Sequence, residues 1–272
     1  MSSVMFNVVI FNKNYSRYLE ELFDSLSNNK VFNDNSVKIY FCDDASSDDS
    51  LLFVNDYKSR YSISNLSIIQ TRKTPFVRKH FSHGQIEGLK LVFENSCEYE
   101  QSYFFLLDSD DLYSSTYVSS VRKEIERNTP NLLLCNTQDF NTETTFEQKK
   151  IKRKISARPG IWPTVVLTSA IVISYDFIRN NREAIFDFSY SDVWLDSRLN
   201  ILGLNDYKKV VYLNPVMFRR IHSSNDSKKM NLKRKVIKQI EATEYFNKYV
   251  NVETRFNLRR YFLEKLSQCI RK

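Results

Sequence analysis

Residues 1–111 alternate between two hydrophobic periodicities, and this alternation constrains the fold more than any other feature of the chain. Short apolar runs rich in β-branched and aromatic residues are typical of buried parallel strands. Between these runs, apolar residues recur every three to four positions, as on one face of a helix. The alternation predicts an α/β fold, an open and mostly parallel sheet flanked by helices. We expect its strands at residues 4–11, 37–42, 66–69 and 103–107.

The second half of the chain is less regular but still contains strand and helix patterns. A helix is expected to end at Gly203, because glycine commonly terminates helices. A basic, glycine-free stretch is expected to form a loop or ribbon. The expected strands are residues 132–135, 165–174 and 209–213, the helix covers residues 191–202, and the basic stretch covers residues 148–158.

The positive charge of the chain is concentrated at its C-terminal end. Residues 228–272 hold 13 Lys and Arg against 4 Asp and Glu, a net charge of +9, which leaves −1 for the rest. Two amphipathic helices are expected in this C-terminal helical extension, which we separate from a domain of residues 1–227 whose halves meet near residue 111. The basic faces suit an anionic membrane surface. The apolar stripes can instead pack on the preceding domain.

Several classes of protein are excluded or disfavoured by the composition. Four glycines in 272 residues exclude a GxGxxG loop and a P-loop, which bring glycine backbone against phosphate, so side chains must hold any nucleotide. The longest apolar stretch, residues 165–173, is too short to span a membrane. Residues 1–10 lack signal-peptide features, so we expect a cytoplasmic protein. The four cysteines form no CxxC pair, which argues against a zinc cluster or a disulfide framework.

The strand at residues 103–107 is followed by Asp108, Ser109, Asp110 and Asp111. Carboxylates this close raise one another's pKa unless a cation neutralises them. Oxygen ligands on one short turn, with open coordination positions, favour Mg²⁺ or Mn²⁺ bound together with substrate phosphates. The turn therefore predicts a metal site. The alternative is an Asp-rich turn that only caps the next helix.

A second acidic cluster follows the strand at residues 37–42. Asp43 and Asp44 stand at its carboxyl end, where open α/β sheets bind their ligands. Their carboxylates can accept hydrogen bonds from a base N–H or from ribose hydroxyls. The alternative is that Ser46 or Ser47 caps the next helix, with Asp48 and Asp49 in its first turn, where the helix dipole favours negative charge. Both roles are compatible if Asp48 and Asp49 cap while Asp43 and Asp44 face the ligand.

Five segments resemble, in order and spacing, the motifs of family 2 glycosyltransferases. Their similarity extends over residues 4–227. Residues 8–26 are similar to VVIPTYNRxxYLxxxLxSL, residues 42–48 (CDDASSD) to VDDGSTD, residues 107–111 to LDSDD, residues 191–199 (SDVWLDSRL) to EDWxLWLRL, and residues 219–227 (RRIHSSNDS) to YRxHxxNxS.

The resemblance implies a GT-A-like fold, a nucleotide-diphospho-sugar donor, an inverting displacement and one Mg²⁺ or Mn²⁺ ion. It implies that Asp110 binds the metal, supported by Asp108 and Asp111, and that His222 completes the site. Donor contacts are expected at the carboxyl ends of the strands, from Phe11, Asn12, Asn14, Asp43, Asp44, Arg72, His83, Asp108 and Ser109.

The resemblance divides residues 1–227 into a nucleotide-binding half, about residues 1–111, and an acceptor half, about residues 112–227. In the acceptor half, it implies that Asp192 is the general base that inversion requires. Asp196 is the competing base and is expected one turn later on the same helical face. Trp194 either stacks on the acceptor sugar or packs in the core. Ser191 stands where the family has Glu or His before the base, so the means of orienting the base is open.

Two further departures concern the donor half. Phe11 replaces the usual proline, which is expected to leave the first turn less rigid but the sheet intact. Residues 79–85 replace the usual arginine-asparagine stretch, so donor contacts there are not carried over from the family.

The resulting hypothesis is a cytoplasmic enzyme at the inner face of the plasma membrane that glycosylates a saccharide or lipid-linked acceptor in bacterial surface polysaccharide or glycolipid synthesis. No nucleic acid partner is expected, and a homo-oligomer stays open. A nucleotidyltransferase is one alternative, although its usual glycine-rich first loop is missing. A non-catalytic membrane or nucleic-acid adaptor acting through the basic extension is another, but it leaves the acidic turn and Asp192 unexplained.

Overall fold

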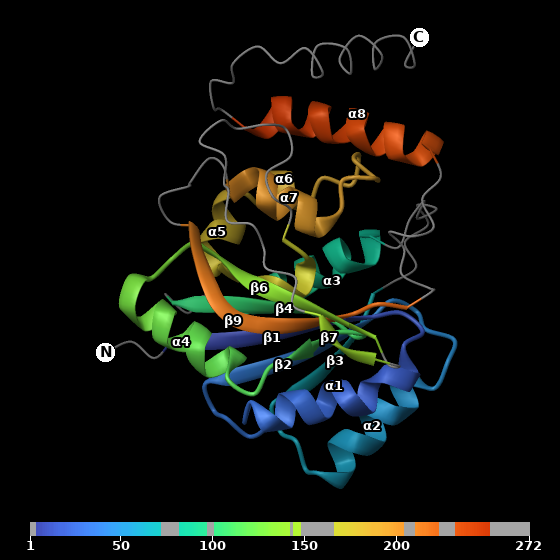
Figure 1. The fold of residues 1–272 in the computed structure, drawn as a ribbon, viewed down its shortest axis with the longest axis vertical. Helices are drawn as coiled ribbons and strands as arrows, with labels where there is room; N and C mark the ends of the chain where they lie inside the picture. Colours follow the sequence, from blue (N-terminus) through green and yellow to red (C-terminus); the bar gives the residue numbers. More distant parts are fainter. Residues whose placement is uncertain are drawn as a thin grey trace.

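The computed structural model describes residues 4–71, 82–96, 101–141, 144–147, 166–203, 210–222 and 232–250. Within these residues, a nine-stranded mixed sheet crosses the molecule and carries helices on both faces (Figure 1). The expected loop at residues 148–158, Arg72 and the second helix of the C-terminal extension lie outside the described residues.

The four strands expected in the first half all form, and they run parallel to one another. Their order in the sheet is β3-β2-β1-β4, so β1 lies between the strands that carry the two acidic clusters. The register pairs Asn12 with Asp43 and Phe11 with Asp108, which brings the carboxyl ends of these strands together. The strands are β1 (Met5–Asn12), β2 (Val37–Asp43), β3 (Leu66–Gln70) and β4 (Ser102–Asp108).

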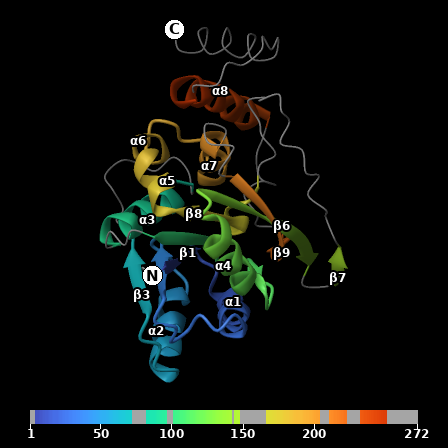
Figure 2. The ribbon, with the colours of Figure 1, turned by 90° about the vertical axis from the view of Figure 1, so that its left-hand side faces the viewer.

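Three helices connect these strands and cover both faces of the sheet. Helices α1 (Ser16–Asn28) and α2 (Ser50–Arg60) lie on one face, and α3 (Ser82–Asn95) lies on the other (Figure 2). Helix α1 buries Tyr18, Leu19, Leu22, Phe23 and Leu26, the apolar stripe that its periodicity predicts.

The second half of the chain extends the sheet from β4 with mixed strand directions. Strand β8 (Ile171–Ser174) pairs antiparallel with β4 and with β6 (Leu132–Asn141), and β9 (Val210–Arg220) pairs parallel with β6. Strand β5 (Leu112–Tyr113) pairs antiparallel with β9, and β7 (Thr144–Glu147) pairs antiparallel with β6. Helix α4 (Tyr117–Asn128) follows β5.

Three expected strands have clearly different limits from those predicted. The strand expected at residues 132–135 continues to Asn141 as β6. The strand expected at residues 165–174 covers only Ile171–Ser174, because residues Thr168–Ala170 form a 3₁₀ turn. The strand expected to end before Pro215 continues to Arg220. Its pairing with β6 skips residues 214 and 215 and resumes at Val216. This irregularity accommodates a proline, which has no N–H to donate to a sheet.

The helix expected at residues 191–202 begins later, as α7 (Leu195–Leu202). Trp194 has an extended backbone, with φ −67° and ψ 162°. The backbone N–H of Asp192 donates to Glu241 Oε2 at 2.6 Å, and α7 begins three residues later. Asp192 therefore precedes the helix, and the prediction that it shares a helical face with Asp196 is wrong.

A layer of short helices and α8 (Leu232–Tyr249) covers the outer side of this half (Figure 1). The short helices are α5 (Tyr175–Asn180) and α6 (Arg182–Ile185). Helix α8 buries Tyr245 and Phe246 against the domain, and the Tyr245 hydroxyl donates to the Ala184 carbonyl at 3.0 Å. The first helix of the C-terminal extension thus packs on the preceding domain. None of the described helices combines the length and the apolar character needed to cross a membrane.

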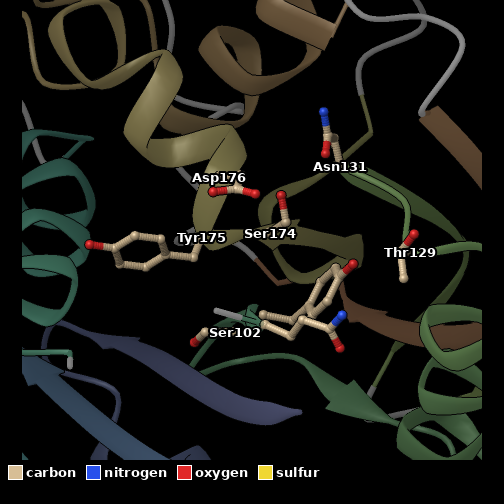
Figure 3. A pocket seen from close by; sticks show the side chains of 8 residues that line it. Ser102, Thr129, Asn131, Ser174, Tyr175 and Asp176 are labelled. Atoms are coloured by element: carbon tan, nitrogen blue, oxygen red, sulfur yellow. The ribbon is translucent and has the colours of Figure 1, made fainter. Parts of the chain in front are cut away.

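A cavity of about 230 Å³ lies at the amino ends of β4 and β6, at the opposite end of β4 from the acidic turn (Figure 3). Two of its hydroxyls already have partners within the protein. Ser102 accepts from Asn7 Nδ2 at 2.8 Å, and Ser174 accepts from the Phe177 N–H at 3.0 Å. Its lining also includes Thr129, Asn131, Tyr175 and Asp176.

Arg198 of α7 is fully buried and organises the segment that leads to Asp192. Its guanidinium donates to four backbone carbonyls, so one side chain fixes the path of the whole segment. The acceptors are Ile185 at 2.8 Å and Asp187, Tyr190 and Val193 at 2.7 Å each.

We predict that Arg198→Lys lowers the free energy of unfolding by about 3 kcal/mol, because a single ammonium cannot reach all four carbonyls and leaves buried acceptors without donors. Chemical denaturation measures the change. Arg179→Lys on α5, whose side chain is 57% exposed, is the matched control and is expected to change the value by less than about 0.5 kcal/mol. Equal stability of the Arg198→Lys and wild-type proteins would contradict this role.

Candidate active site

The acidic turn is anchored to the end of β1 through Ser109. Both the backbone N–H and the hydroxyl of Ser109 donate to the Phe11 carbonyl, at 3.0 and 2.9 Å. The Asp111 N–H donates to the Asp108 carbonyl at 3.0 Å and closes the turn. Phe11 itself lies in the hydrophobic core. Phe11 and Ser109, both expected to contact the donor, therefore hold the turn in place.

Asp111 accepts hydrogen bonds at both oxygens. Ser169 Oγ donates to Oδ2 at 2.6 Å, and the Arg220 N–H donates to Oδ1 at 2.9 Å. Burial and the neighbouring Asp110 charge raise the pKa of Asp111 to about 8. Ser169 Oγ also accepts from the Asp108 N–H at 2.9 Å. These contacts fit the supporting position expected for Asp111.

Asp108 faces the N-terminal turn of α3. Gln85 Nε2 donates to Asp108 Oδ1 at 2.5 Å. Burial, followed by the charges of Asp110 and Asp111, raises the pKa of Asp108 well above its usual value. The close spacing of the carboxylates in the sequence predicted that they would raise one another's pKa. The raised pKa values of Asp108 and Asp111 agree with this expectation.

His222 reaches the acidic turn from the end of β9. Its Nε2 lies 2.8 Å from Asp110 Oδ2, although the residues are 112 positions apart. Tyr15 and Tyr18 contact the imidazole, with ring centroids at 5.8 and 5.3 Å. The structure therefore brings together the two ends of the expected metal site.

The Asp110 and His222 pair fits a partial metal-binding set. Two ligands at about 2.1 Å in adjacent octahedral positions are about 3 Å apart, close to the separation of these two atoms. Over the described ranges, no group of three or more His, Cys, Asp or Glu side chains is arranged to hold a metal ion. Asp110 and His222 are therefore two candidate ligands, and the described residues hold no complete metal site.

Arg220 joins the two halves of the chain at this site, and its side chain is 1% exposed. Its Nε donates to the Asp110 carbonyl at 3.0 Å, and its Nη2 lies 2.8 Å from Glu21 Oε2. The guanidinium also stacks between Tyr18 and Phe140, 4.6 Å from each ring centroid. Arg220 thereby fixes the backbone of the acidic turn.

Asp43 stabilises the loop between β2 and α2. Its Oδ1 accepts from Asn12 Nδ2 at 2.9 Å and from Ser46 Oγ at 2.6 Å, and its Oδ2 accepts from the Ser46 N–H at 2.9 Å. Asp43 is completely buried. The Ser46 hydroxyl binds Asp43 and does not cap α2. Asp48 instead accepts from the N–H groups of Ser16 and Ser50, at the starts of α1 and α2.

Asp44 lies where β2 approaches α3. Thr71 Oγ1 donates to Asp44 Oδ1 at 2.9 Å, and Lys13 Nζ lies 3.6 Å from Asp44 Oδ2. A Cβ at Gly84 would come within 2.8 Å of the Asp44 carboxyl group. A side chain larger than glycine at this position would therefore require the Asp44 carboxylate to move.

Asn14 and His83 border the same edge of the sheet. Asn14 is exposed, has a φ of 57°, and accepts from the Ser47 N–H at 2.7 Å. His83 is buried in the first turn of α3, with its ring edge-on to Phe188 at 5.7 Å. Arg72, the remaining residue expected to contact the donor, lies outside the described residues.

The expected base and acceptor residues lie beneath α8. Arg234 Nε donates to Asp192 Oδ1 at 3.1 Å, and Asp192 is 3% exposed. Lys238 Nζ lies 3.6 Å from the centroid of the Trp194 ring, so the cation covers one face of the indole. Burial raises the pKa of Asp196, and the Asp196 charge contributes to the raised pKa of Asp108. This electrostatic coupling links α7 to the acidic turn.

Several residues of the site were not singled out from the sequence. Arg220 stands two positions before His222 in a segment that carries the family resemblance, so its place in the chain was an available signal. The contacts of Ser169 and Gln85 with the acidic turn depend on long-range packing and leave no local pattern. The same is true of Arg234 and Glu241 on α8.

A family model described as "Glycosyl transferase family 2" matches residues 7–186. The chain belongs to glycosyl transferase family 2. The match covers nearly all of the four parallel strands β1–β4 and the acidic turn of this family 2 chain, and it confirms the family resemblance. It ends before the similar segments at residues 191–199 and 219–227. Among curated proteins, no significant match was found.

Solved glycosyltransferase structures share the GT-A fold of this family 2 chain. The structure of S. aureus TarS 1-349 in complex with UDP superposes with a TM-score of 0.65 at 14% identity, covering 97% of this chain and 71% of TarS 1-349. TarS 1-349 in complex with UDP-GlcNAc gives a TM-score of 0.58 at 12% identity, with coverages of 91% and 72%.

A mannosyltransferase from Pyrobaculum calidifontis, PcManGT in complex with GDP-Man and Mn²⁺, is a further structural relative. It gives a TM-score of 0.56 at 10% identity, covering 96% of this family 2 chain and 68% of the mannosyltransferase. At these identities the comparisons establish the fold, and the expected GT-A architecture is confirmed.

We predict that Gly84→Ala displaces the Asp44 carboxylate, because the added methyl group would lie 2.8 Å from it. The overpacking is expected to lower the free energy of unfolding by about 1–3 kcal/mol and to weaken binding of nucleotide-sugar. Denaturation and titration calorimetry measure the two effects. Lys90→Ala on α3, at a side chain that is 40% exposed, is the control. Unchanged values for Gly84→Ala would show that the close approach is not required.

Proposed function

We propose that the chain is an inverting, metal-dependent glycosyltransferase that moves a sugar from a nucleotide-diphospho-sugar to a saccharide or lipid-linked acceptor. The 2.8 Å contact between Asp110 and His222 carries the proposal, because it joins the two halves of the chain at the ligand-binding edge of the sheet. Solved relatives with UDP, UDP-GlcNAc or GDP-Man bound support a donor of this class. Membership of glycosyl transferase family 2 argues against the nucleotidyltransferase and adaptor alternatives.

In this proposal Asp110 and His222 bind one Mn²⁺ or Mg²⁺ ion, and Asp108 and Asp111 support them. A divalent cation here supplies charge neutralisation for the diphosphate leaving group. Of the two ions, Mn²⁺ suits an imidazole ligand better, since Mg²⁺ prefers oxygen ligands more strongly. Arg220 keeps the turn in position through the Asp110 carbonyl.

We assign direct contacts with the nucleoside to Asn14 and Asp44, in the loops that follow β1 and β2. Asn14 is exposed, and the Asp44 carboxylate can accept from a base N–H or a ribose hydroxyl. Asn12 and Asp43 are buried and bonded to each other, so we assign them to shaping the loop. His83, at the start of α3, is assigned to the wall of the donor site.

We assign the general base to Asp192 in preference to Asp196. Arg234 Nε donates to Asp192 Oδ1 at 3.1 Å and orients this carboxylate. Burial raises the pKa of Asp196 and so disfavours its ionised form. Trp194 is assigned to the acceptor side, with Lys238 covering one face of its ring.

We also propose that the enzyme acts in bacterial surface polysaccharide or glycolipid synthesis at the inner face of the plasma membrane. Arg234 and Lys238 contact Asp192 and Trp194 within the protein. Attachment to an anionic membrane therefore depends on the other basic residues of 228–272, many of which lie outside the described residues. Attachment to the membrane stays a prediction, and so does assembly of the chain into a homo-oligomer.

A thermal-shift screen of UDP-, GDP-, dTDP- and CMP-sugars with Mn²⁺ identifies the donor, since a bound ligand raises the melting temperature. For the selected donor, we predict that Asp110→Asn abolishes the Mn²⁺-dependent part of the binding while the protein remains folded. Titration calorimetry with and without Mn²⁺ measures this. Asp176→Asn, at an exposed residue near the opposite cavity, controls for the loss of a carboxylate. Retained metal-dependent affinity in Asp110→Asn would refute the metal assignment.

We predict that Asp192→Asn keeps its affinity for the donor but loses sugar transfer by about 10²-fold or more, as expected on removal of a general base. Release of nucleoside diphosphate from the selected donor measures the rate, and calorimetry measures the affinity. Asp196→Asn is the comparison. If Asp196→Asn loses transfer and Asp192→Asn does not, the two assignments are exchanged.

A further inference from the structure

We infer that Glu241 of α8 is a positioning residue for Asp192, so that α8 completes the acceptor half of the active site. The inference rests on the proposed function, in which Asp192 is the general base. It assigns a role in the reaction to a helix of the basic extension, beyond surface charge or membrane attachment.

The contact between α8 and the base segment is made by one carboxylate. Glu241 Oε2 accepts from the Asp192 N–H at 2.6 Å, and Oε1 accepts from the Ser191 hydroxyl at 3.4 Å. A carboxylate that accepts from two consecutive residues restrains both the position and the rotation of the segment. Residues 191–194 precede α7. Arg198 binds the Tyr190 and Val193 carbonyls on either side of Asp192, and Glu241 adds a restraint on the Asp192 N–H and the Ser191 hydroxyl.

Glu241 also supplies a charged group that can orient the base, although Ser191 has replaced the Glu or His of the related motif. The related motif has an acidic or imidazole side chain directly before the base, and here a short hydroxyl occupies that position. The charged group instead comes from residue 241, 50 positions later in the chain. The Ser191 hydroxyl is the donor that this distant carboxylate binds.

The same face of α8 carries two further contacts with the acceptor half. Arg234, Lys238 and Glu241 are spaced i, i+4 and i+7, which places them on one face of the helix. Arg234 Nε bonds Asp192 Oδ1 at 3.1 Å, and Lys238 Nζ lies 3.6 Å from the Trp194 ring centroid. Glu241 therefore belongs to a set of residues directed at the base and its neighbour.

The far end of α8 is tied to the start of the same segment. Lys248 Nζ and the Tyr249 hydroxyl both donate to Asp187 Oδ2, at 3.0 and 2.7 Å. The segment from residue 187 to 194 is thus held by α8 at both ends. Tyr245 and Phe246 are buried between these contacts and fix the helix against the domain.

The test compares Glu241→Ala and Glu241→Gln with Glu244→Gln, which removes a carboxylate one turn further along α8. The assay is release of nucleoside diphosphate from UDP-GlcNAc or GDP-mannose, whichever the thermal-shift screen selects, with water as acceptor. We expect Glu241→Ala to lower kcat by about tenfold or more, while donor affinity and melting temperature stay near wild type. Glu241→Gln keeps one acceptor oxygen and is expected to fall between Glu241→Ala and wild type.

A double-variant cycle separates positioning from independent effects. If Glu241 acts through Asp192, adding Glu241→Ala to Asp192→Asn lowers the rate no further than Asp192→Asn alone. Hydrogen exchange supplies a readout independent of activity. Peptides that cover residues 187–194 are expected to lose protection in Glu241→Ala and to keep it in Glu244→Gln.

The outcomes distinguish this inference from the proposed function. If Asp192→Asn is fully active, the assignment of the base fails, whatever Glu241 does. If Asp192→Asn is inactive but Glu241→Ala keeps the wild-type rate and protection, only the positioning role fails. Equal losses of rate, donor affinity and melting temperature in Glu241→Ala would likewise overturn it, since they indicate a general structural role.

Discussion

Asp108, Asp110 and Asp111 share one tight, buried turn, and the repulsion among their charges is the constraint on which the surrounding arrangement depends. Hydrogen-bond donors from several elements bind the carboxylates of Asp108 and Asp111. These donors are Ser169 in the 3₁₀ turn before β8, Gln85 on α3 and the Arg220 backbone on β9. These donors are neutral, so they satisfy the oxygens without cancelling the charge. The turn is consequently rigid yet electrostatically incomplete, a state that favours binding of a cation.

The path of β9 makes this arrangement possible. Two extra residues beside Cys135 let the strand pass Pro215 and resume its pairing with β6. The resumed register continues to Arg220, and His222 follows directly. A strand that ended before Pro215 would leave the acidic turn without Arg220 between Tyr18 and Phe140. One local irregularity in the sheet therefore determines whether the two halves of the chain share a site.

Features with local signals were predictable, and those that depend on distant packing were not. The apolar runs gave the parallel strands, and the carboxylates after β4 indicated the acidic turn from their spacing alone. The predicted start of α7 was wrong, and the Asp192 N–H bonds Glu241, a residue of a different helix that no local pattern indicates. The end of β9 was wrong because a proline, which ordinarily stops pairing, is accommodated by skipped residues. Ser169 and Gln85 gave no pattern, since their roles arise only when remote segments meet.

Helix α8 follows the last described strand of the sheet in the chain, and this order has a consequence for biosynthesis. Domains fold largely as their segments leave the ribosome, beginning with the N-terminal segments. The sheet and the acidic turn can assemble while α8 is still inside the exit tunnel. Asp192 acquires its partners on Arg234 and Glu241 only after that helix emerges. Under the proposed function, the nucleotide-binding half can therefore form before the acceptor half is complete, which delays reactivity until α8 has left the ribosome.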